Sequence, residues 1–573
     1  MGQLSPTLLN NLSRNIHRHW RTPWLLGVLA LYLALTMYQL GLPGLHYDEA
    51  REAGVNAMEI LTGAPVTAFR GVTVNFWGQP LPLMVQDYIG ALNVYLALPL
   101  LALTGAGVPN LRMLSILTGL VALLLLERAV SEWQAGFGQQ TELGATPSAR
   151  FPTPLSRAGL LTITLLAASP SFVFWSRQGI FVTNLTQPLS FWCIWQGLRW
   201  LRTGHAHVLV ISAFAGGLAI YAKLLALWVI GPFALLAAGW WFWQRIQQRR
   251  SGAIRQTTVP QLSFSTTLGM LLALILPLLP LLFFYLHTGA ASDILHKLDQ
   301  SYYGIDNRDW LTNLFVRWSQ LLQSLRGDHL WYLGGIYGNA SAPWLAGIAL
   351  LGGLWRDWRR VAPIMLLLLL TFACSLFTIS SLFVTHYAVV QPLLVASVGV
   401  GLSTWWMGQQ QVRWALLPSF ALCAVLIWFS LDLAASLRYH AALSQSGGLA
   451  DHSDATYHLA YYLRYHGEGS PIALDWGLDA PVRYLSQGTV TPIEIFGYAS
   501  PSQPDAAFAQ RLQPFLADPN NVYLLHTPNQ TIFTGRRELF IQMAKAANLR
   551  LVQETQFSQR NGQGLFELWR AVP

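Results

Sequence analysis

Two adjacent carboxylates, Asp48 and Glu49, lie close behind His46, just after the first long apolar segment of the chain. A carboxylate can take a proton from a hydroxyl or an amine, so this group could act as a general base. Where a membrane segment meets water, such a base can reach both a lipid-borne and a water-borne molecule. The local alternative is that Asp48 and Glu49 only stabilise the first turn of a helix that begins near Tyr47, because acidic side chains favour that position.

Basic side chains from distant parts of the chain complete the candidate site: Arg112, Arg177, Lys223 and His386. Each lies at an end of an apolar segment, and the topology derived below brings all of them to the face of Asp48. Arginine and lysine side chains are suited to bind phosphate. For Lys223 the local alternative is an ordinary lysine at a helix end, whose ammonium group reaches the membrane surface.

A carboxylate that faces such cations fits one reaction type well, the transfer of a sugar from a lipid phosphate carrier. The carboxylate takes the proton of the attacking hydroxyl or amine, and attack on the opposite face of the sugar inverts the anomeric centre. The cations stabilise the negative charge that gathers on the departing phosphate.

The composition is that of a membrane protein. Of the 573 residues, 53% are hydrophobic and 11% are charged, and the mean hydropathy is +0.38. This is more apolar surface than one soluble core can bury. The net charge of +9 does not indicate nucleic-acid binding, because Lys and Arg cluster beside apolar segments, where they set the membrane topology. Cys193, Cys374 and Cys423 lie inside apolar runs, so neither a disulfide framework nor a metal site is predicted.

About eleven apolar segments are long enough to cross a bilayer. They are residues 24–42, 109–127, 158–175, 180–199, 207–222, 224–243, 264–287, 343–355, 361–382, 386–406 and 413–433. Residues 1–23 are basic, and no small-residue cleavage pattern follows the first segment, so we expect a retained cytoplasmic N-terminus. The transmembrane module is predicted to cover residues 24–437.

The apolar stretch 81–103 is predicted not to cross the membrane. It carries Gln86, Asp87 and Asn93. The Lys- and Arg-rich segments that join the other apolar segments fall on the cytoplasmic side, where such segments are expected, only if this stretch stays outside. We therefore expect a helix that lies at the outer membrane surface, within a long outer loop (residues 43–108) that also holds Asp48. The alternative, that the stretch spans and the charge bias is imperfect, stays open because the rule is statistical.

Residues 438–573 are predicted to form an extracytoplasmic α/β domain, because strand-like and helical pieces alternate there. Helices are expected at 454–466, 479–486, 505–516 and 536–547, and strands at 471–475, 491–496, 521–526, 551–557 and 565–570. The domain lacks a glycine-rich phosphate loop.

Several motifs follow one another along the chain: Tyr47–Ala50, Gln79–Pro82, Leu111–Ser115, Gly217–Lys223, His386–Tyr387 and Gln391–Pro392. In this order they resemble the motifs of the polyprenyl-phosphate-sugar-dependent glycosyltransferases of the GT-C class, the group that holds protein O-mannosyltransferases and lipid A aminoarabinose transferases. The resemblance covers about residues 46–410. It implies that Asp48 is the base, that Lys223 binds the carrier phosphate, and that His386 and Tyr387 line the site.

The residues and the resemblance together predict a catalytic pair, Asp48 and Glu49, and a phosphate site. The predicted phosphate-binding residues are Lys223, Arg112, Arg177, His386 and Tyr387, and the predicted remaining cavity residues are His46, Gln79 and Asn184. Two of these depart from the family pattern. Gln79 stands where relatives have a lysine, and Asn184 follows Arg177 where relatives have an aspartate.

Two other functions stay open. A transporter or flippase-like protein should show internal repeats and charges near the middle of the membrane, whereas the polar groups here cluster at one face. An inactive scaffold that keeps the fold is favoured by Gln79 and Asn184.

The expected partners are a polyprenyl-phosphate sugar donor, a lipid, glycan or protein acceptor, and membrane lipids. A divalent metal could take part, with His46 and Glu49 assisting it, but no cofactor is assigned. The resemblance alone suggests the inner membrane of a bacterium.

Overall fold

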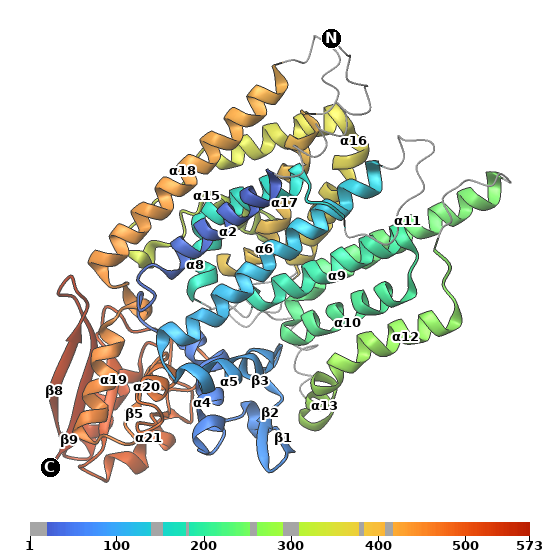
Figure 1. The fold of residues 1–573 in the computed structure, drawn as a ribbon. Coiled ribbons are helices and arrows are strands. Elements are labelled where there is room, and N and C mark those ends of the chain that lie inside the picture. The colour runs from blue at the N-terminus through green and yellow to red at the C-terminus, as the bar shows by residue number, and fades with distance from the viewer. Residues whose placement is uncertain are drawn as a thin grey trace.

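The computed structural model describes residues 20–138, 153–178, 183–251, 260–289, 309–377, 383–406 and 416–573. Within these ranges a bundle of long helices carries two further parts at one end, the outer loop and a C-terminal domain with a β-sheet (Figure 1). The chain is therefore a multi-pass helical membrane protein with a C-terminal α/β domain, as the sequence predicts.

Six helices of the described residues are long and apolar enough to cross a bilayer, and the bent pair α7–α8 makes a seventh. The six are α6 (Val108–Gly138), η3 with α11 (Leu224–Ser251), α12 with α13 (Phe264–Thr288), α16 (Ala342–Ser375), η6 with α17 (Val384–Thr404) and α18 (Leu417–Ser446). Helices α2 (Arg21–Met37), α9 (Thr183–Thr203) and α10 (Ala206–Ala222) lie where three more spans were predicted. Each of the eleven predicted segments thus contains helix. Among the described residues only six or seven helices are long and apolar enough to cross a bilayer, so the count of eleven is not confirmed.

One predicted span contains a broken helix, and a second break separates two predicted spans. Helices α7 (Arg157–Ala168) and α8 (Pro170–Gln178) meet at a bend of 69°, so the segment 158–175 is not one straight span. Pro170 causes the break, since proline disfavours helical backbone in the residue before it, and Ser169 is extended. Helix α16 is interrupted at Asp357, where φ is −152° and ψ is 76°. This break falls between the two predicted segments 343–355 and 361–382.

The outer loop begins with one helical segment and continues with short strands. Helices α3 (Tyr47–Glu49), η1 (Ala50–Gly54) and α4 (Val55–Thr62) are continuous. Strands β1 (Thr73–Phe76) and β2 (Gln79–Pro82) form one hairpin, β3 (Met84–Gln86) and β4 (Ile89–Gly90) another, and helix α5 (Leu92–Thr104) ends the loop.

The helix predicted over 81–103 begins only at Leu92, so its first half was predicted wrongly. Pro80 and Pro82 lack the backbone N–H that a helix needs, and they lie in β2 instead. With 13 residues, α5 is about 20 Å long, less than the hydrocarbon core of about 30 Å. A straight helix of this length cannot cross, which agrees with the predicted topology of the stretch.

The C-terminal domain follows α18, which continues to Ser446, past the predicted boundary at 438. Its five-stranded sheet has the order β6-β5-β7-β9-β8, with β5 parallel to β6 and β7, and β9 antiparallel to β7 and β8. All helices and strands predicted between residues 454 and 570 are present. They are α19 (Ala455–His466), β5 (Ile472–Ala473), α20 (Asp479–Leu485), β6 (Ile493–Glu494), α21 (Phe508–Leu516), β7 (Val522–His526), α22 (Arg536–Ala546), β8 (Arg550–Ser558) and β9 (Gly564–Val572).

The outer loop and the C-terminal domain share one hydrophobic core. Val55 and Met58 of the loop are buried in the same cluster as Leu459 and Tyr484 of the domain. Gly54 lies flat against the ring of Tyr484, where an added Cβ would come within 2.9 Å of the ring. The domain therefore covers the helical segment that carries Asp48, and the two parts must fold against each other.

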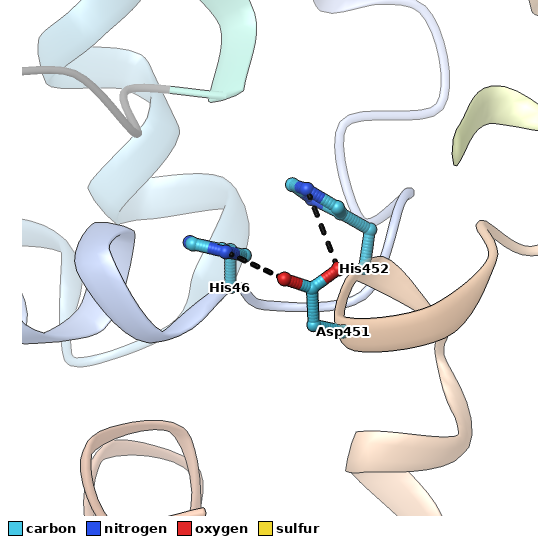
Figure 2. A group of neighbouring side chains, drawn as sticks. All are labelled: His46, Asp451 and His452. Carbon is cyan, nitrogen blue, oxygen red and sulfur yellow. Dashed lines mark hydrogen bonds and ion pairs between the residues drawn. The ribbon is translucent and has the colours of Figure 1, made fainter. Parts of the chain in front are cut away.

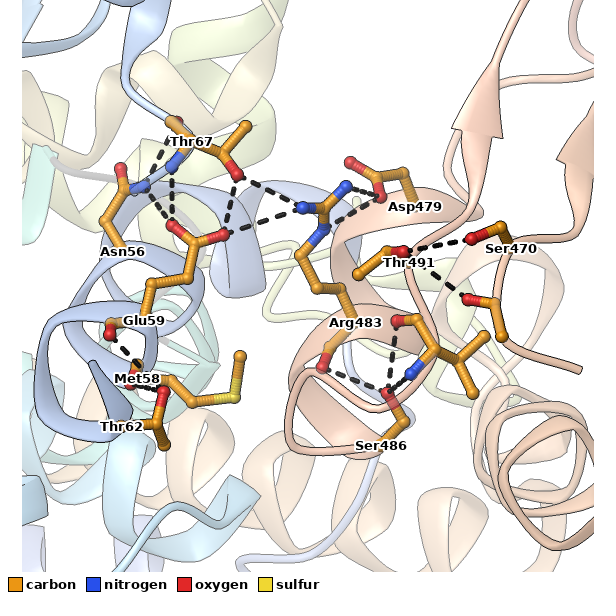
Figure 3. A network of polar contacts seen from close by, with 12 residues as sticks. Asn56, Met58, Glu59, Thr62, Thr67, Ser470, Asp479, Arg483, Ser486 and Thr491 are labelled. Atoms are coloured by element: carbon orange, nitrogen blue, oxygen red, sulfur yellow. Dashed lines mark hydrogen bonds and ion pairs between the residues drawn. The ribbon is translucent and has the colours of Figure 1, made fainter. Parts of the chain in front are cut away.

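A polar network reinforces this interface (Figure 3). Arg483 of α20 donates to Asp479 Oδ1 at 2.8 Å and to Thr67 Oγ1 at 3.1 Å, and its Nη1 lies 3.6 Å from Glu59 Oε1. The Glu59 carboxylate also accepts from Asn56 Nδ2 at 2.9 Å and from the Thr67 backbone N–H at 2.8 Å. Arg483 is the cation between two largely buried carboxylates from different parts of the chain.

Replacing this cation should loosen the C-terminal domain. Arg483→Met removes the counter-charge of Glu59 and Asp479, and we expect a loss of about 3 kcal/mol in unfolding free energy because both carboxylates stay buried. Thermal unfolding of the full-length protein in detergent and limited proteolysis measure the effect. The exposed Arg550→Met is the matched control, and an equal loss in both variants would show that the network does not hold the interface.

Candidate functional site

Asp48 lies in the first turn of the helical segment α3–η1–α4. His46 caps this turn, because its Nδ1 accepts from the Asp48 backbone N–H at 3.1 Å. The predicted helix start near Tyr47 is confirmed. The Asp48 side chain stays 32% exposed. Burial raises the pKa of its carboxyl group, and the charges of His46 and Lys223 oppose this shift.

Glu49, the second carboxylate, faces the opposite way and is fully paired with Arg112. The guanidinium group binds both carboxylate oxygens, with Nε 2.7 Å from Oε1 and Nη2 3.0 Å from Oε2. Arg112 also donates to the carbonyl oxygens of Leu40 at 2.9 Å and Gly44 at 3.3 Å. Both charged side chains are buried, so Arg112, predicted as a phosphate ligand, is turned toward protein groups.

Arg177 binds the same turn from the other side. Its Nη2 donates to the carbonyl oxygens of Gln39 at 2.7 Å and Leu42 at 3.1 Å, and its Nη1 to His440 Nδ1 at 3.1 Å. The side chain is fully buried at the end of α8. Arg112 and Arg177 together thus hold residues 39–44, the segment that leads from α2 to His46.

Lys223 comes from the membrane bundle and feels the charges of two acidic residues of the outer loop. It lies between α10 and η3 and is 4% exposed. Asp48 and Glu52 are the acidic groups that act on its charge, and its Nζ lies 5.8 Å from the ring centroid of Tyr88. The outer loop also holds the backbone next to Lys223, because the Leu224 N–H donates to the Tyr88 carbonyl oxygen at 3.1 Å. Asp48 and Lys223 therefore lie close enough for their charges to interact.

His386 joins this group, whereas Tyr387 does not. His386 lies in η6 and is half-buried, and the charge of Lys223 acts on its imidazole ring. Tyr387 is completely buried, and its hydroxyl group lies 3.2 Å from Ser375 Oγ. Its position supports η6 from inside the helix bundle.

The C-terminal domain adds two residues beside Asp48 that the sequence did not assign to the site. Asp451 Oδ2 lies 3.1 Å from His46 Nε2, and Asp451 Oδ1 lies 3.8 Å from His452 Nε2 (Figure 2). The rings of His46 and His452 stack at 4.5 Å between centroids. Burial lowers the pKa of His452 to about 3, so this ring is neutral.

A second group from the C-terminal domain faces Tyr47. The ring of Trp476 lies 4.9 Å from that of Tyr47, and the hydroxyl groups of Tyr47 and Tyr498 are 3.4 Å apart. Tyr498 donates to Glu494 Oε2 at 2.9 Å. Burial, followed by the charge of Asp479, raises the pKa of Glu494 to about 7. Aromatic faces and a carboxyl group therefore lie next to the helical turn of Asp48.

One predicted cavity residue does not join the group, and the side chain of another is not described. Gln79 pairs with Phe76 at the end of the β1–β2 hairpin, where its side chain is exposed. Asn184 lies in the first turn of α9, and its side chain is outside the described residues.

Sequence reasoning missed Glu52, Asp451, His452 and Trp476. Glu52 follows Asp48 by one helical turn, which is a usable signal for a shared face. Asp451 and His452 mark the change of composition after α18, but nothing in the sequence links them to residue 46. Only the docking of the C-terminal domain places them at the site.

Comparisons with known proteins identify the fold. No protein-family model and no curated protein matches the sequence. Among solved structures, ArnT from Cupriavidus metallidurans bound to undecaprenyl phosphate is similar, with a TM-score of 0.55, 12% identity, and coverage of 96% of this chain and 98% of ArnT. The chain therefore has a GT-C-like fold.

Two further structures match with lower scores. The apo oligosaccharyltransferase of Archaeoglobus fulgidus has a TM-score of 0.48 and 13% identity, over 89% of this chain and 70% of its own. The arabinofuranosyltransferase AftD from Mycobacteria has a TM-score of 0.45 and 14% identity, over 96% of this chain and 42% of its own.

The Arg112–Glu49 pair provides a test of how the site is held. Glu49→Ala leaves a buried guanidinium group without its carboxylate, and we expect the unfolding free energy to fall by about 3–5 kcal/mol. The double variant Glu49→Ala/Arg112→Ala should lose less than the sum of the single variants, because the two groups act as a pair. Thermal unfolding in detergent measures this. The exposed Glu538→Ala is the control, and additive losses would contradict the pairing.

Proposed function

We propose that the chain is an integral membrane glycosyltransferase that moves a sugar from a polyprenyl-phosphate carrier to an acceptor at the extracytoplasmic face. The observation that carries this proposal is that Asp48, from the outer loop, and Lys223, from the membrane bundle, are near enough for their charges to interact. It occurs in a fold similar to that of ArnT, whose crystal structure contains undecaprenyl phosphate.

In the proposed reaction Asp48 is the general base. The hydroxyl or amine group of the acceptor attacks the anomeric carbon and gives its proton to the Asp48 carboxylate. The bond between the anomeric carbon and the phosphate oxygen breaks, and its electron pair leaves with the phosphate. Attack from the face opposite the phosphate inverts the anomeric centre. A carboxyl group whose pKa is raised by burial is a stronger base than one in water, and this favours Asp48 for the step.

Lys223 and His386 are the proposed ligands of the carrier phosphate. Lys223 is a buried ammonium group between two membrane helices, a position that is costly unless an anion is nearby. Asp48 and Glu52 supply part of that negative charge in the free protein. A phosphate group that gains charge as the sugar departs interacts more strongly with the ammonium group, and this lowers the barrier.

The other charged residues at the site are proposed as positioning residues. Glu49, Arg112 and Arg177 hold the turn before His46 and have protein partners for their charges. The C-terminal domain is proposed to bind the acceptor, because Trp476 and Tyr498 present aromatic faces beside Tyr47, and Glu494 offers a carboxyl group. Lipids, glycans and proteins remain the candidate acceptors.

The role of Asp48 can be tested with donor lipid from cells that lack the protein, where the unused carrier-linked sugar should accumulate. With this extract and purified full-length protein in nanodiscs, Asp48→Asn should reduce sugar transfer by about 100-fold or more, because the proton acceptor is lost. Mass spectrometry of the lipid-linked sugar measures the transfer. The exposed Asp518→Asn should keep wild-type activity.

Full transfer by Asp48→Asn would exclude the general-base role. If wild-type protein transfers no sugar and the lipid-linked sugars of the cells do not change, the chain is an inactive scaffold. Movement of the intact donor across the nanodisc or vesicle membrane without loss of its sugar would favour a transporter.

The role of Lys223 is tested by carrier binding alone. Lys223→Ala should weaken the binding of undecaprenyl phosphate by about 10-fold, since a charge-assisted contact is lost. Binding of undecaprenol, which lacks the phosphate, should not change. Native mass spectrometry of the full-length protein measures both ligands, and the exposed Lys545→Ala is the matched control. Equal weakening for both lipids would show that Lys223 acts through the fold and not on the phosphate.

A further inference from the structure

The imidazole rings of His46 and His452 and the carboxylate of Asp451 converge at the boundary between the outer loop and the C-terminal domain. Their ligand atoms all lie within 4.8 Å of one another. His46 Nε2 and Asp451 Oδ2 are 3.1 Å apart, and His452 Nε2 and Asp451 Oδ1 are 3.8 Å apart. Ligand atoms around a tetrahedral zinc ion lie about 3.4 Å apart, given bonds of about 2.1 Å. The two observed separations, 3.1 Å to Asp451 Oδ2 and 3.8 Å to Asp451 Oδ1, lie on either side of that value.

We propose that His46, Asp451 and His452 form a binding site for a divalent transition-metal ion of the Zn²⁺ type. Two imidazole nitrogens and one carboxylate oxygen are ligands that zinc prefers, and three protein ligands leave one coordination position open. Hard ions such as Mg²⁺ and Ca²⁺ prefer oxygen ligands, so this set does not favour them. The inference does not depend on the proposed reaction, because it concerns binding of the ion itself.

The state of His452 independently indicates a missing ligand. Its side chain is 11% exposed, and its buried Nδ1 has no hydrogen-bond partner among the described residues. Its Nε2 lies 3.8 Å from Asp451 Oδ1, beyond hydrogen-bond distance (Figure 2). A buried imidazole normally has a hydrogen bond at one of its nitrogens. A metal ion at Nε2 would give this ring the partner that it lacks.

The surrounding charges suit a divalent cation. Asp451 and Asp48 are carboxylates on either side of His46, at 3.1 Å from Nε2 and 3.9 Å from Nδ1. The charge of Arg112 acts on His452, and this guanidinium group is already paired with Glu49. A bound metal ion would therefore lie near the carboxylates of Asp48 and Asp451, and the positive charge of Arg112 is already paired with Glu49.

The ion would tie the C-terminal domain to the turn of Asp48. One ligand comes from the outer loop and two come from η8 (Ala450–His452), directly after the last membrane helix. A metal on His46 Nε2 also places the ring proton on Nδ1, since a neutral imidazole has one N–H. Nδ1 would then give up the N–H of the Asp48 backbone and donate to the Asp48 carboxylate. Occupancy of the site would thus fix the orientation of this side chain.

The test uses full-length protein with a tag that contains no histidine, stripped with EDTA and dialysed against Zn²⁺. We expect one tightly bound zinc ion per chain by elemental analysis, and a loss of at least 10-fold in affinity in His46→Ala and in His452→Ala. His458→Ala, an exposed histidine of α19 in the same domain, should bind like the wild type. Co²⁺ should give visible absorption bands of a nitrogen- and oxygen-ligated ion, which both site variants lose.

Stability measurements keep the test decisive where a variant folds poorly. Zn²⁺ should raise the thermal unfolding temperature of the wild type and of His458→Ala, and leave that of the conservative variants His46→Gln and His452→Gln unchanged. The proposal is overturned if stripped wild-type protein takes up no zinc, or if the variants bind as much zinc as the wild type. In the first case His46 and Asp451 form a hydrogen-bonded contact between the two parts and nothing more.

Discussion

Two buried guanidinium groups determine where Asp48 lies. Arg112 and Arg177 donate to the carbonyl oxygens of residues 39–44, a turn with no regular secondary structure to satisfy them. Buried carbonyl groups require donors, and arginine offers several in a fixed plane. The cost of burying the Arg112 charge is offset by Glu49, which follows Asp48 directly. The ion pair of Glu49 with Arg112 thereby holds the neighbouring Asp48 in place.

The candidate site belongs to three parts of the chain at once. The outer loop supplies Asp48, the membrane bundle supplies Lys223 and His386, and the C-terminal domain supplies Asp451, His452 and Trp476. These parts are held by a shared core of buried side chains and by Arg483 between two carboxylates. A small shift of the C-terminal domain would therefore change the surroundings of His46, and with them those of Asp48.

The GT-C-like fold explains why sequence similarity to known proteins is so weak while the architecture is kept. Lipid-facing positions require only apolar side chains, so they restrict residue identity very little. The positions that restrict it more are the polar ones at the end of the bundle, where each charge needs a partner.

The sequence by itself determined the membrane class, the apolar segments and the secondary structure of residues 454–570, and it singled out Asp48 and Lys223 as candidate site residues. Each follows from local composition, periodicity or a motif. Only the tertiary structure decided that Arg112 binds Glu49, that Arg177 binds a turn, and that Asp451 and His452 reach His46. The break between α7 and α8 differs, because Pro170 is a local cause that the sequence contains. Partner choice depends on which groups become buried together, and contacts between residues hundreds of positions apart leave no periodic signal in one sequence.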